Sequence, residues 1–525
     1  MNRREFCMAA GAAAALSASD LLASSARAAT LPAEADPNPA GGYTLKPPRQ
    51  FLFTDYRHIS PGDLSWRSPE GKYLPVAGPP GPPVEAHADA ESVARGIRLV
   101  AQKATKEGPI EGLPSRIIHH EGRYLTWSIR VDYGSGQDLG SYSRASAKSI
   151  SISCGQSKDG YAWNWTEAGE VKPPAVSGID GEYFFIDPQG PADERYKCIY
   201  HAQVLSGQAD LWKKYQANTH PRNRDVRLGP DTINCLFGMV SPDGLNWKPI
   251  PEPLLIHKGD TDNTVYFDEW LGKYVLYTRL YWMNRRMVAR AESDDFRHWT
   301  PVDPILWPRL DDPLCWDVYT NGRTAYPGLP EHHLMFPIFY RRLTQTSEIH
   351  LHSSIDGIHW DRVPGGPVLV PGEPGSWDGE YLVAGKQLVP LSKDRIAIPY
   401  AGVDHPHKYP RWPGVITGKA GWAWWPRGRL CALRADEEGQ FDTFSLKVTG
   451  QQLRLNVKVH RAGEIRAGLV GIEGRSVIDC DPITGDHLEH TVTWKGDSHL
   501  RVDLDAGVTL RFRMRSAELF GFEWS

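Results

Sequence analysis

The sequence predicts an all-β protein, a five-bladed β-propeller followed by a C-terminal antiparallel β-sandwich. Three observations predict this fold: a turn motif that recurs through the middle of the chain, an apolar and aromatic strand ahead of each copy, and strict polar-apolar alternation after residue 445. The composition agrees, because 50 Gly, 42 Pro and 19 Trp in 525 residues are typical of a turn-rich β protein.

The first 29 residues have the features of an export signal. Arg3 and Arg4 precede a short apolar run, and Ala26 and Ala28 supply small residues for cleavage. The paired arginines predict twin-arginine export, so we expect the mature protein in the periplasm or outside the cell. The run is shorter than a bilayer span and no later segment is long and apolar enough, so no membrane partner is expected.

Residues 30–109 are expected to form an N-terminal arm that packs on the propeller. The overall charge is balanced, with 59 Lys+Arg against 63 Asp+Glu, so nucleic acid is not an expected partner. The cysteines show no metal-ligand spacing, so no metal or cofactor is expected. Spaced carboxylates in a channel would still suit a structural calcium ion.

Residues 110–444 contain the repeat. The motif Ser-x-Asp-(Gly/Phe)-x-x-Trp begins at Ser157, Ser241, Ser293 and Ser354. Asp-Gly favours a tight turn, Ser can hydrogen-bond across it and Trp can pack the returning strand, so we interpret these aspartates as structural. The copies lie about one propeller blade apart, and a degenerate fifth copy is expected at residues 428–441. Residues 445–525 then form the predicted sandwich.

The innermost strand of a propeller blade lines the central channel, so residues just ahead of each aromatic strand are candidates for chemistry. The acids found there are Asp180 and Glu182 in blade two, Asp260 and Asp262 in blade three, Asp317 in blade four, and Asp378 and Glu380 in blade five, with Arg116 at the matching place in blade one. Opposed carboxylates are what glycoside hydrolysis requires. The alternative is that Asp180 and Asp378 only make turns and that Asp260 is an exposed loop charge.

Residues 259–263, residues 377–380 and the C-terminal sandwich resemble the five-bladed propeller glycosidases of glycoside hydrolase families 32 and 43. Residues 49–55, 481–486, 493–496 and 519–522 resemble exported bacterial proteins related to family 32. The resemblance implies two catalytic aspartates and a glutamic acid from different inner strands. It assigns Asp262 and Asp317 to the aspartate roles and Glu380 to the acid, with Asp180 competing for the base. Asp55 is a further candidate because the family 32 nucleophile lies near the mature N-terminus.

We expect a carbohydrate substrate. The residues predicted to bind it are Asp55, Arg116, Asp260, Trp316, Trp377, Asp378, His405 and His407. Aromatic residues between positions 412 and 425 either stack on sugar rings or seal the junction with the sandwich. A basic insertion at residues 205–228, which includes Arg227, either covers the channel mouth and meets an acidic or sulfated sugar, or is a solvated loop.

Two other functions fit the sequence. A non-catalytic carbohydrate-binding propeller would explain the repeat and the aromatic residues equally well. A polysaccharide lyase would use a Tyr or His base beside a cation that neutralises a uronate, and His405 and His407 are available for that role.

Overall fold

The computed structural model describes residues 50–62, 66–67, 73–74, 92–134, 144–408 and 418–525. Within these ranges the chain forms antiparallel sheets and one α-helix, α2 (Gln208–Asn218), which confirms the predicted all-β class. No helix in the described ranges is long and apolar enough to cross a membrane. The predicted export signal and residues 30–49 of the arm lie outside the described residues.

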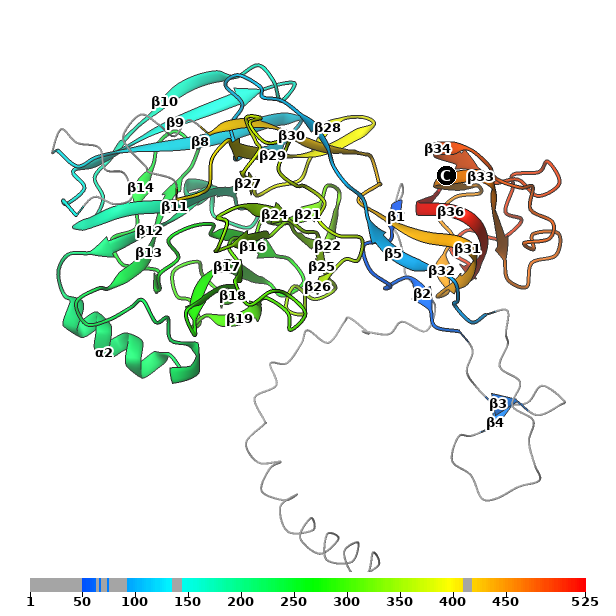
Figure 1. Cartoon of the computed structure of the whole chain (residues 1–525), viewed down its shortest axis with the longest axis horizontal. Coiled ribbons are helices and arrows are strands. Elements are labelled where there is room, and N and C mark those ends of the chain that lie inside the picture. Colours follow the sequence, from blue (N-terminus) through cyan, green and yellow to red (C-terminus); the bar gives the residue numbers. More distant parts are fainter. Residues whose placement is uncertain (1–49, 63–65, 68–72, 75–91, 135–143, 409–417) are drawn as a thin grey trace, which may run out of the picture.

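The first three blades are antiparallel sheets of four or five strands (Figure 1). Blade one contains β7 (Ile118–His120), β8 (Arg123–Asp132), β9 (Ser149–Ser157) and β10 (Asn164–Val171). Blade two contains β11 (Val176–Ile186), β12 (Tyr196–Val204), β13 (Asn234–Ser241), β14 (Lys248–Pro249) and β15 (Leu255–Ile256). Blade three contains β16 (Thr264–Asp268), β17 (Lys273–Trp282), β18 (Arg285–Ser293) and β19 (Asp303–Leu306).

The fourth unit is divided between two small sheets. One holds β20 (Trp316–Val318), β23 (Ile338–Arg341) and β24 (Ser347–Ile349), and the other holds β21 (Arg323–Tyr326), β22 (Leu329–Met335), β25 (His352–Ser354) and β26 (Asp361–Arg362).

The fifth unit is completed from the N-terminal side of the chain. It holds β27 (Tyr381–Ala384), β28 (Val389–Ser392), β29 (Arg395–Val403) and β30 (Lys419–Pro426). The strand β6 (Thr105–Glu107), which precedes blade one in sequence, pairs with β30 as the outer strand of this sheet. The first and last parts of the propeller are therefore joined by backbone hydrogen bonds.

The units form a closed ring. Each touches the next, through contacts of β8 with β11, β11 with β16, β18 with β20, β24 with β27 and β28 with β7. A separate cluster of buried apolar side chains fills each junction, and the cluster beside blade five continues into the C-terminal sheet. This packing holds the first strands of the five units around a common centre.

The repeated motif forms the predicted turns. In the copy at Ser241, the Ser Oγ accepts the N–H of Gly244 at 3.0 Å, and Asp243 Oδ1 accepts the N–H of Leu245 at 2.9 Å. The fourth position has positive φ in every copy, which Gly adopts freely and which Phe296 adopts with a fully buried ring. The Trp indole donates back to that residue's carbonyl in three copies. These hydrogen bonds confirm that the motif aspartates are structural.

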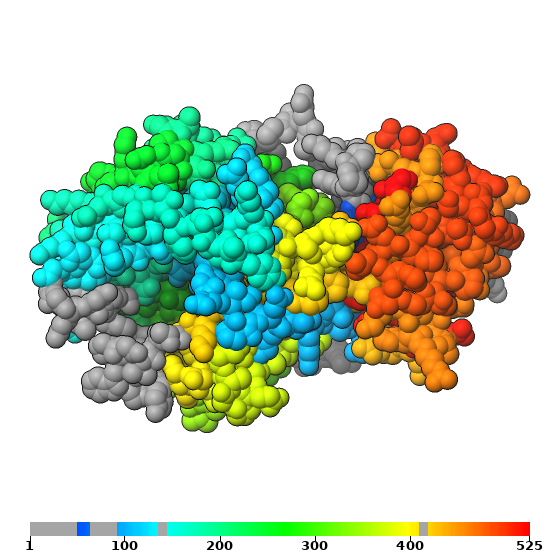
Figure 2. All heavy atoms as spheres, turned by 90° about the horizontal axis from the view of Figure 1, so that it is seen from above, coloured from blue at the N-terminus to red at the C-terminus, as the bar shows by residue number. Residues whose placement is uncertain are grey.

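The C-terminal part is a seven-stranded antiparallel sheet that forms a second lobe beside the propeller (Figure 2). Its strands are β1 (Gln50–Leu52), β2 (Ile59–Ser60), β5 (Arg98–Ala101), β31 (Cys431–Thr443), β33 (Leu453–Leu469), β34 (Asp486–Thr491) and β36 (Leu510–Trp524). The rings of Phe512 and Phe522 lie 6.0 Å apart although ten residues of extended strand span about 33 Å. The sheet therefore bends on itself, at a bulge opposite Ser516, where φ is 44°.

Two boundaries differ from the prediction. Residues 431–443, expected to close blade five, form β31 and pair with β36 in the C-terminal sheet. Strands β1, β2 and β5 of the arm, expected on the propeller, also belong to this sheet. The reason is that residues 445–525 supply few long strands. The edges of those strands are therefore paired by segments that lie far away in the sequence.

Candidate active site

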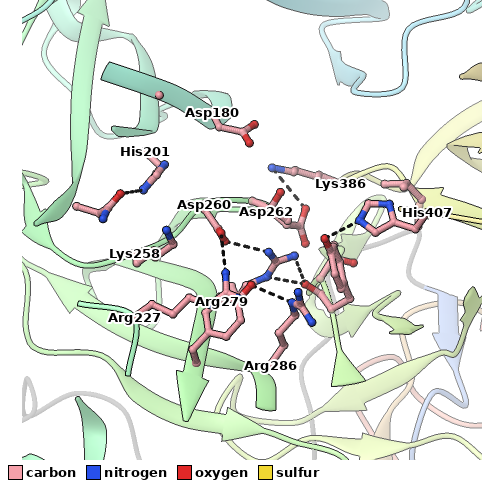
Figure 3. Close-up of a pocket in the computed structure, with 18 of the residues that line it drawn as sticks. Asp180, His201, Arg227, Lys258, Asp260, Asp262, Arg279, Arg286, Lys386 and His407 are labelled. Atoms are coloured by element: carbon pink, nitrogen blue, oxygen red, sulfur yellow. Dashed lines mark hydrogen bonds and ion pairs between the residues drawn. The ribbon is translucent and has the colours of Figure 1, made fainter. Parts of the chain in front are cut away.

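A cavity of about 450 Å³ lies at the centre of the ring (Figure 3). All five units contribute to its lining, so it is the channel cavity that the propeller prediction implies. Its lining contains three carboxylates, from Asp180, Asp260 and Asp262. The first belongs to β11 of blade two, and the other two lie in the loop that leads into β16 of blade three.

Asp262 is held in a fixed orientation by backbone donors. Its Oδ2 accepts the N–H groups of Asn321, at 2.5 Å, and Gly322, at 3.0 Å. Its Oδ1 lies 3.4 Å from the ammonium group of Lys386. The Asp262 backbone has a φ of 59°, in the left-handed region that few non-glycine residues adopt and that Asp and Asn enter more readily than the others. A strained residue with a locked carboxylate at a cavity wall is typical of a functional position.

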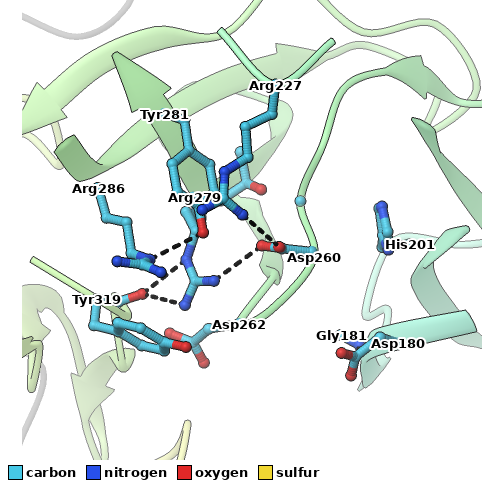
Figure 4. Close-up of polar contacts among 12 residues, drawn as sticks. Asp180, Gly181, His201, Arg227, Asp260, Asp262, Arg279, Tyr281, Arg286 and Tyr319 are labelled. Atoms are coloured by element: carbon cyan, nitrogen blue, oxygen red, sulfur yellow. Dashed lines mark hydrogen bonds and ion pairs between the residues drawn. The ribbon is translucent and has the colours of Figure 1, made fainter. Parts of the chain in front are cut away.

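Asp260 holds Arg279 in place between blades three and four (Figure 4). Arg279 Nη1 donates to Asp260 Oδ1 at 2.9 Å, and its Nε and Nη2 donate to the backbone oxygen of Tyr319. Burial by itself would raise the pKa of Asp260, but the positive charges of Arg279, His201, Lys258 and Arg227 together outweigh burial, and the pKa lies below its ordinary value. Asp260 is therefore ionised over the physiological pH range.

Asp180 has the opposite electrostatic environment. Its Oδ1 accepts the N–H of Gly181 at 2.7 Å, and no cation forms an ion pair with it among the described residues. Burial, and after it the negative charge of Glu182, raises the pKa of Asp180 to about 6. Asp180 is thus an acid that keeps its proton under mildly acidic conditions.

Cationic side chains outnumber the carboxylates in the cavity. Burial lowers the pKa of Lys386 to about 8, although Asp262 opposes that shift, so its ammonium group is still largely charged at neutral pH. The ammonium group of Lys258 has no ion pair or hydrogen bond within the described part of the chain. The cationic residues of the lining are Arg116, Arg227, Lys258, Arg279, Arg286, Lys386 and Lys408.

A second cavity, of about 820 Å³, adjoins the first and shares Ser115 and Arg116 with it. The guanidinium group of Arg116 pairs with Glu182, whose side chain faces this second cavity. Trp165 also lines it and is 49% exposed. The two cavities together offer room for a ligand longer than one sugar ring.

Five of the predicted site residues line the central cavity: Arg116, Asp180, Asp260, Asp262 and His407. The His407 ring stacks on Tyr381 at a centroid distance of 4.3 Å, and its Nε2 lies 2.8 Å from the Tyr319 hydroxyl.

Asp317 does not line the cavity. Its side chain is fully buried and binds Arg286, at 2.7 Å, and Arg342, at 2.8 Å. The two guanidinium groups neutralise this carboxylate and take up both of its oxygens. Asp317 is therefore a positioning residue and not the predicted catalytic one: it holds Arg286, and Arg286 lines the cavity.

The predicted residues of blade five also lie outside the described cavities. Asp378 accepts hydrogen bonds from Lys106 Nζ, at 2.7 Å, and the Tyr400 hydroxyl, at 3.0 Å, and is buried. Trp377 packs on Tyr400. Glu380 is half-buried; its backbone N–H donates to the carbonyl of Val403, and its carboxylate has no hydrogen bond or ion pair with the described residues. The residues of this blade that reach the cavity come later, in β27, in the loop after it and in the connection between β29 and β30.

Three further candidates lie away from the cavity. Asp55 pairs with Arg57 at 2.6 Å, and Arg57 reaches two backbone carbonyls of the fourth unit, so this pair attaches the arm. Trp316 packs against Phe339. His405 bonds the adjacent carbonyl of Pro406.

Several residues of the cavity were not predicted. Arg279 and Tyr281 continue the aromatic strand of blade three, and His201 belongs to the second strand of blade two. Arg279 did carry a signal, because a charge in the middle of an apolar strand is uncommon. Lys386, in contrast, follows β27 in a loop with no motif.

No family model matches the chain, and no curated protein matches it. Among solved structures, the chain is similar to an N-acetylgalactosamine deacetylase from F. plautii, with 13% identity, a TM-score of 0.40 and coverage of 71% of this chain and 96% of that one. It is also similar to a family 32 β-fructofuranosidase of Bombyx mori, with 9% identity, a TM-score of 0.37 and coverage of 82% and 94%. A β-1,2-mannobiose phosphorylase from Listeria innocua has 11% identity, a TM-score of 0.37 and coverage of 64% and 93%. None of these likenesses assigns an activity to this chain.

Proposed function

We propose that this protein is a glycoside hydrolase that cleaves an extracellular or periplasmic saccharide in the central cavity. One observation carries the proposal: Asp180 and Asp262, from neighbouring blades, face a common cavity in opposite electrostatic settings. Burial and Glu182 favour the protonated form of Asp180, whereas Asp262 accepts two backbone N–H groups and lies beside the ammonium group of Lys386.

The chemistry divides between the two carboxyl groups. Asp180 would donate its proton to the leaving oxygen of the glycosidic bond as that bond breaks. Asp262 Oδ1, which accepts no backbone N–H within the described part of the chain, would attack the anomeric carbon or remove a proton from water. Asp260 would act as a positioning residue, because it fixes the guanidinium group of Arg279 at the cavity wall.

Tyr281, Tyr319 and Tyr381 would contact the sugar, since all three rings line the cavity and aromatic faces pack on the apolar face of a sugar ring. The second cavity would hold further sugar units beyond Arg116. An extended saccharide fits this arrangement better than a monosaccharide glycoside does.

The test compares leaving groups. Asp180→Asn should lose activity by about 10²-fold or more on natural oligosaccharides but keep most of it on aryl glycosides, whose leaving group needs little protonation. Asp262→Asn should lose activity on both substrates. Asp193→Asn, at an exposed site of blade two, serves as the matched control. Glu380→Gln decides which residue is the general acid. If Glu380→Gln loses activity and Asp180→Asn does not, the assignment of Asp180 as the acid is wrong. If the unaltered protein binds saccharides without cleaving them, it is a lectin and not a hydrolase.

A polysaccharide lyase is the second candidate, supported by the contact between Tyr319 and His407 beside Arg279 and Arg286. A lyase would place a uronate carboxylate on the guanidinium groups and use the Tyr or His as base. The two reactions differ in product, because a lyase leaves an unsaturated sugar that absorbs ultraviolet light. Tyr319→Phe should then abolish turnover, whereas Asp180→Asn should spare it.

A further inference from the structure

A smaller cavity, of about 260 Å³, adjoins the central one on the side of blades three and four. It shares Arg227, Tyr281, Arg286 and Lys408 with the central cavity, so a ligand in one can reach the other. Its lining, as far as the chain is described, contains cationic and neutral side chains and no carboxylate. We call Arg227, Arg286 and Arg342 the outer basic subsite.

The charge of this subsite is only partly neutralised. Asp317 lies behind it and is shared by Arg286 and Arg342, so one carboxylate faces two guanidinium groups. Among the described residues, the one carboxylate paired with the guanidinium group of Arg227 is Asp260, whose Oδ2 lies 3.9 Å from Nη1, beyond hydrogen-bond distance. The site therefore keeps a net positive charge.

The guanidinium groups are also held in place, which distinguishes them from solvated surface charges. Arg227 lies over the ring of Tyr281, with its guanidinium carbon 3.5 Å from the ring centre. Arg286 donates from Nε to the Tyr281 hydroxyl at 2.9 Å and from Nη1 to Asp317. Its Nη2 has no acceptor among the described residues, and neither does the guanidinium group of Arg227. Fixed donors without acceptors match the oxygens of a carboxylate or sulfate.

We propose that the outer basic subsite binds an anionic substituent of the saccharide, a carboxylate or a sulfate ester, and so selects an acidic substrate. This proposal rests on the proposed function, because it takes the central cavity as the place where the saccharide binds. It assigns the basic insertion at residues 205–228 a role in substrate selection, through Arg227. A neutral glycan would leave these donors unsatisfied when it displaces water.

The test measures binding by calorimetry with glucose 6-sulfate, glucuronate, glucose and inorganic sulfate as probes. We expect both anionic sugars to bind, glucose to bind at least about tenfold more weakly, and increasing salt to weaken only the anionic probes. Equal affinity for glucose and the anionic sugars, or no binding of the anionic sugars, would overturn the proposal. Inorganic sulfate that binds as tightly as glucose 6-sulfate would also overturn it, because the site would then select a free anion.

Variants locate the site. Arg227→Gln and Arg342→Gln should each weaken binding of the anionic sugars by about tenfold. Both leave Asp317 with Arg286 as a partner, so the melting temperature should stay close to that of the unaltered protein. Arg222→Gln, an exposed arginine of the same insertion that does not line the cavity, should bind the probes normally. Unchanged affinity in the two subsite variants would overturn the assignment.

Catalysis and anion selection can fail separately. If Asp180→Asn and Asp262→Asn retain full turnover while Arg227→Gln binds the anionic sugars more weakly, the proposed acid pair is wrong and the subsite stands. If the acid pair is verified and Arg227→Gln binds anionic probes normally, the proposed hydrolase function stands and the anion-binding subsite is wrong.

Discussion

At the scale of single residues, environment rather than residue type separates the carboxylates of this protein. Asp180 and Asp317 both lie on first strands and both are poorly exposed. Asp317 faces two guanidinium groups, whereas Asp180 faces Glu182 and the cavity. The first can only hold its arginines, and the second can exchange a proton at a pH near 6.

The raised pKa of Asp180 predicts the pH dependence of the reaction. A general acid must be protonated, so kcat/KM on natural saccharides should fall as the pH rises through about 6. The same measurement on an aryl glycoside should show a weaker fall, since that leaving group needs little protonation. A kcat/KM that stays constant from pH 5 to pH 8 on both substrates would contradict the role of Asp180.

Removal of Asp317 should destabilise the protein. Asp317→Ala leaves Arg286 and Arg342 without their shared carboxylate, and loss of one partner from a buried pair costs about 3–5 kcal/mol of unfolding free energy. Denaturant unfolding measures this loss, with the exposed Asp193→Asn as reference. A change below about 1 kcal/mol would show that the arginines find other partners.

At the scale of elements, the turn between β20 and β21 orients the candidate nucleophile or base. Asn321 and Gly322 present consecutive N–H groups to Asp262. Gly322 has a φ of 52°, and a Cβ there would lie 2.6 Å from the carbonyl oxygen of Phe336. This position needs glycine for both reasons.

Gly322→Ala should therefore lower both stability and activity, because the backbone must shift and move the donors away from Asp262. Gly328→Ala is the matched control: its φ is also positive, at 81°, but a Cβ there would have no atom within 4 Å, and only the backbone cost of about 1–2 kcal/mol is expected. Unfolding curves and kcat give the comparison. Equal effects of the two substitutions would contradict the steric account.

At the scale of the whole molecule, the N-terminal segment joins the two lobes. Strand β6 completes blade five, while β1, β2 and β5 complete the C-terminal sheet. Phe51 of β1 is buried and stacks on Phe522 of β36 at a centroid distance of 4.4 Å. The C-terminal lobe is therefore built from both ends of the described chain.

Phe51→Ala should destabilise the C-terminal lobe by about 3–5 kcal/mol, the usual cost of a large aromatic cavity. Thermal unfolding should show a lower melting temperature, and Trp270→Ala, at a ring that is 88% exposed, should show little change. Equal melting temperatures for the two variants would show that β1 contributes little to the sheet.

Local patterns and the propeller architecture were predicted well, whereas the side-chain partners and strand pairings that join distant segments were not. The Ser-x-Asp turns could be predicted because their hydrogen bonds join residues at most three positions apart. Asp180, Asp260 and Asp262 could be predicted because their place ahead of a strand or early within it implies a place near the channel. The role of Asp317 could not, because Arg286 and Arg342 reach it from other segments.

By itself, the sequence determined the all-β class and the repeated turns, because strand alternation and turn chemistry act over a few residues. It also supplied the set of candidate acids from which the three carboxylates of the central cavity come. Only the tertiary structure decided which acids face that cavity, which arginines surround it and which distant strands complete the C-terminal sheet. The physical reason is that charge pairing, burial and sheet edges depend on neighbours in space, and those neighbours lie far apart along the chain.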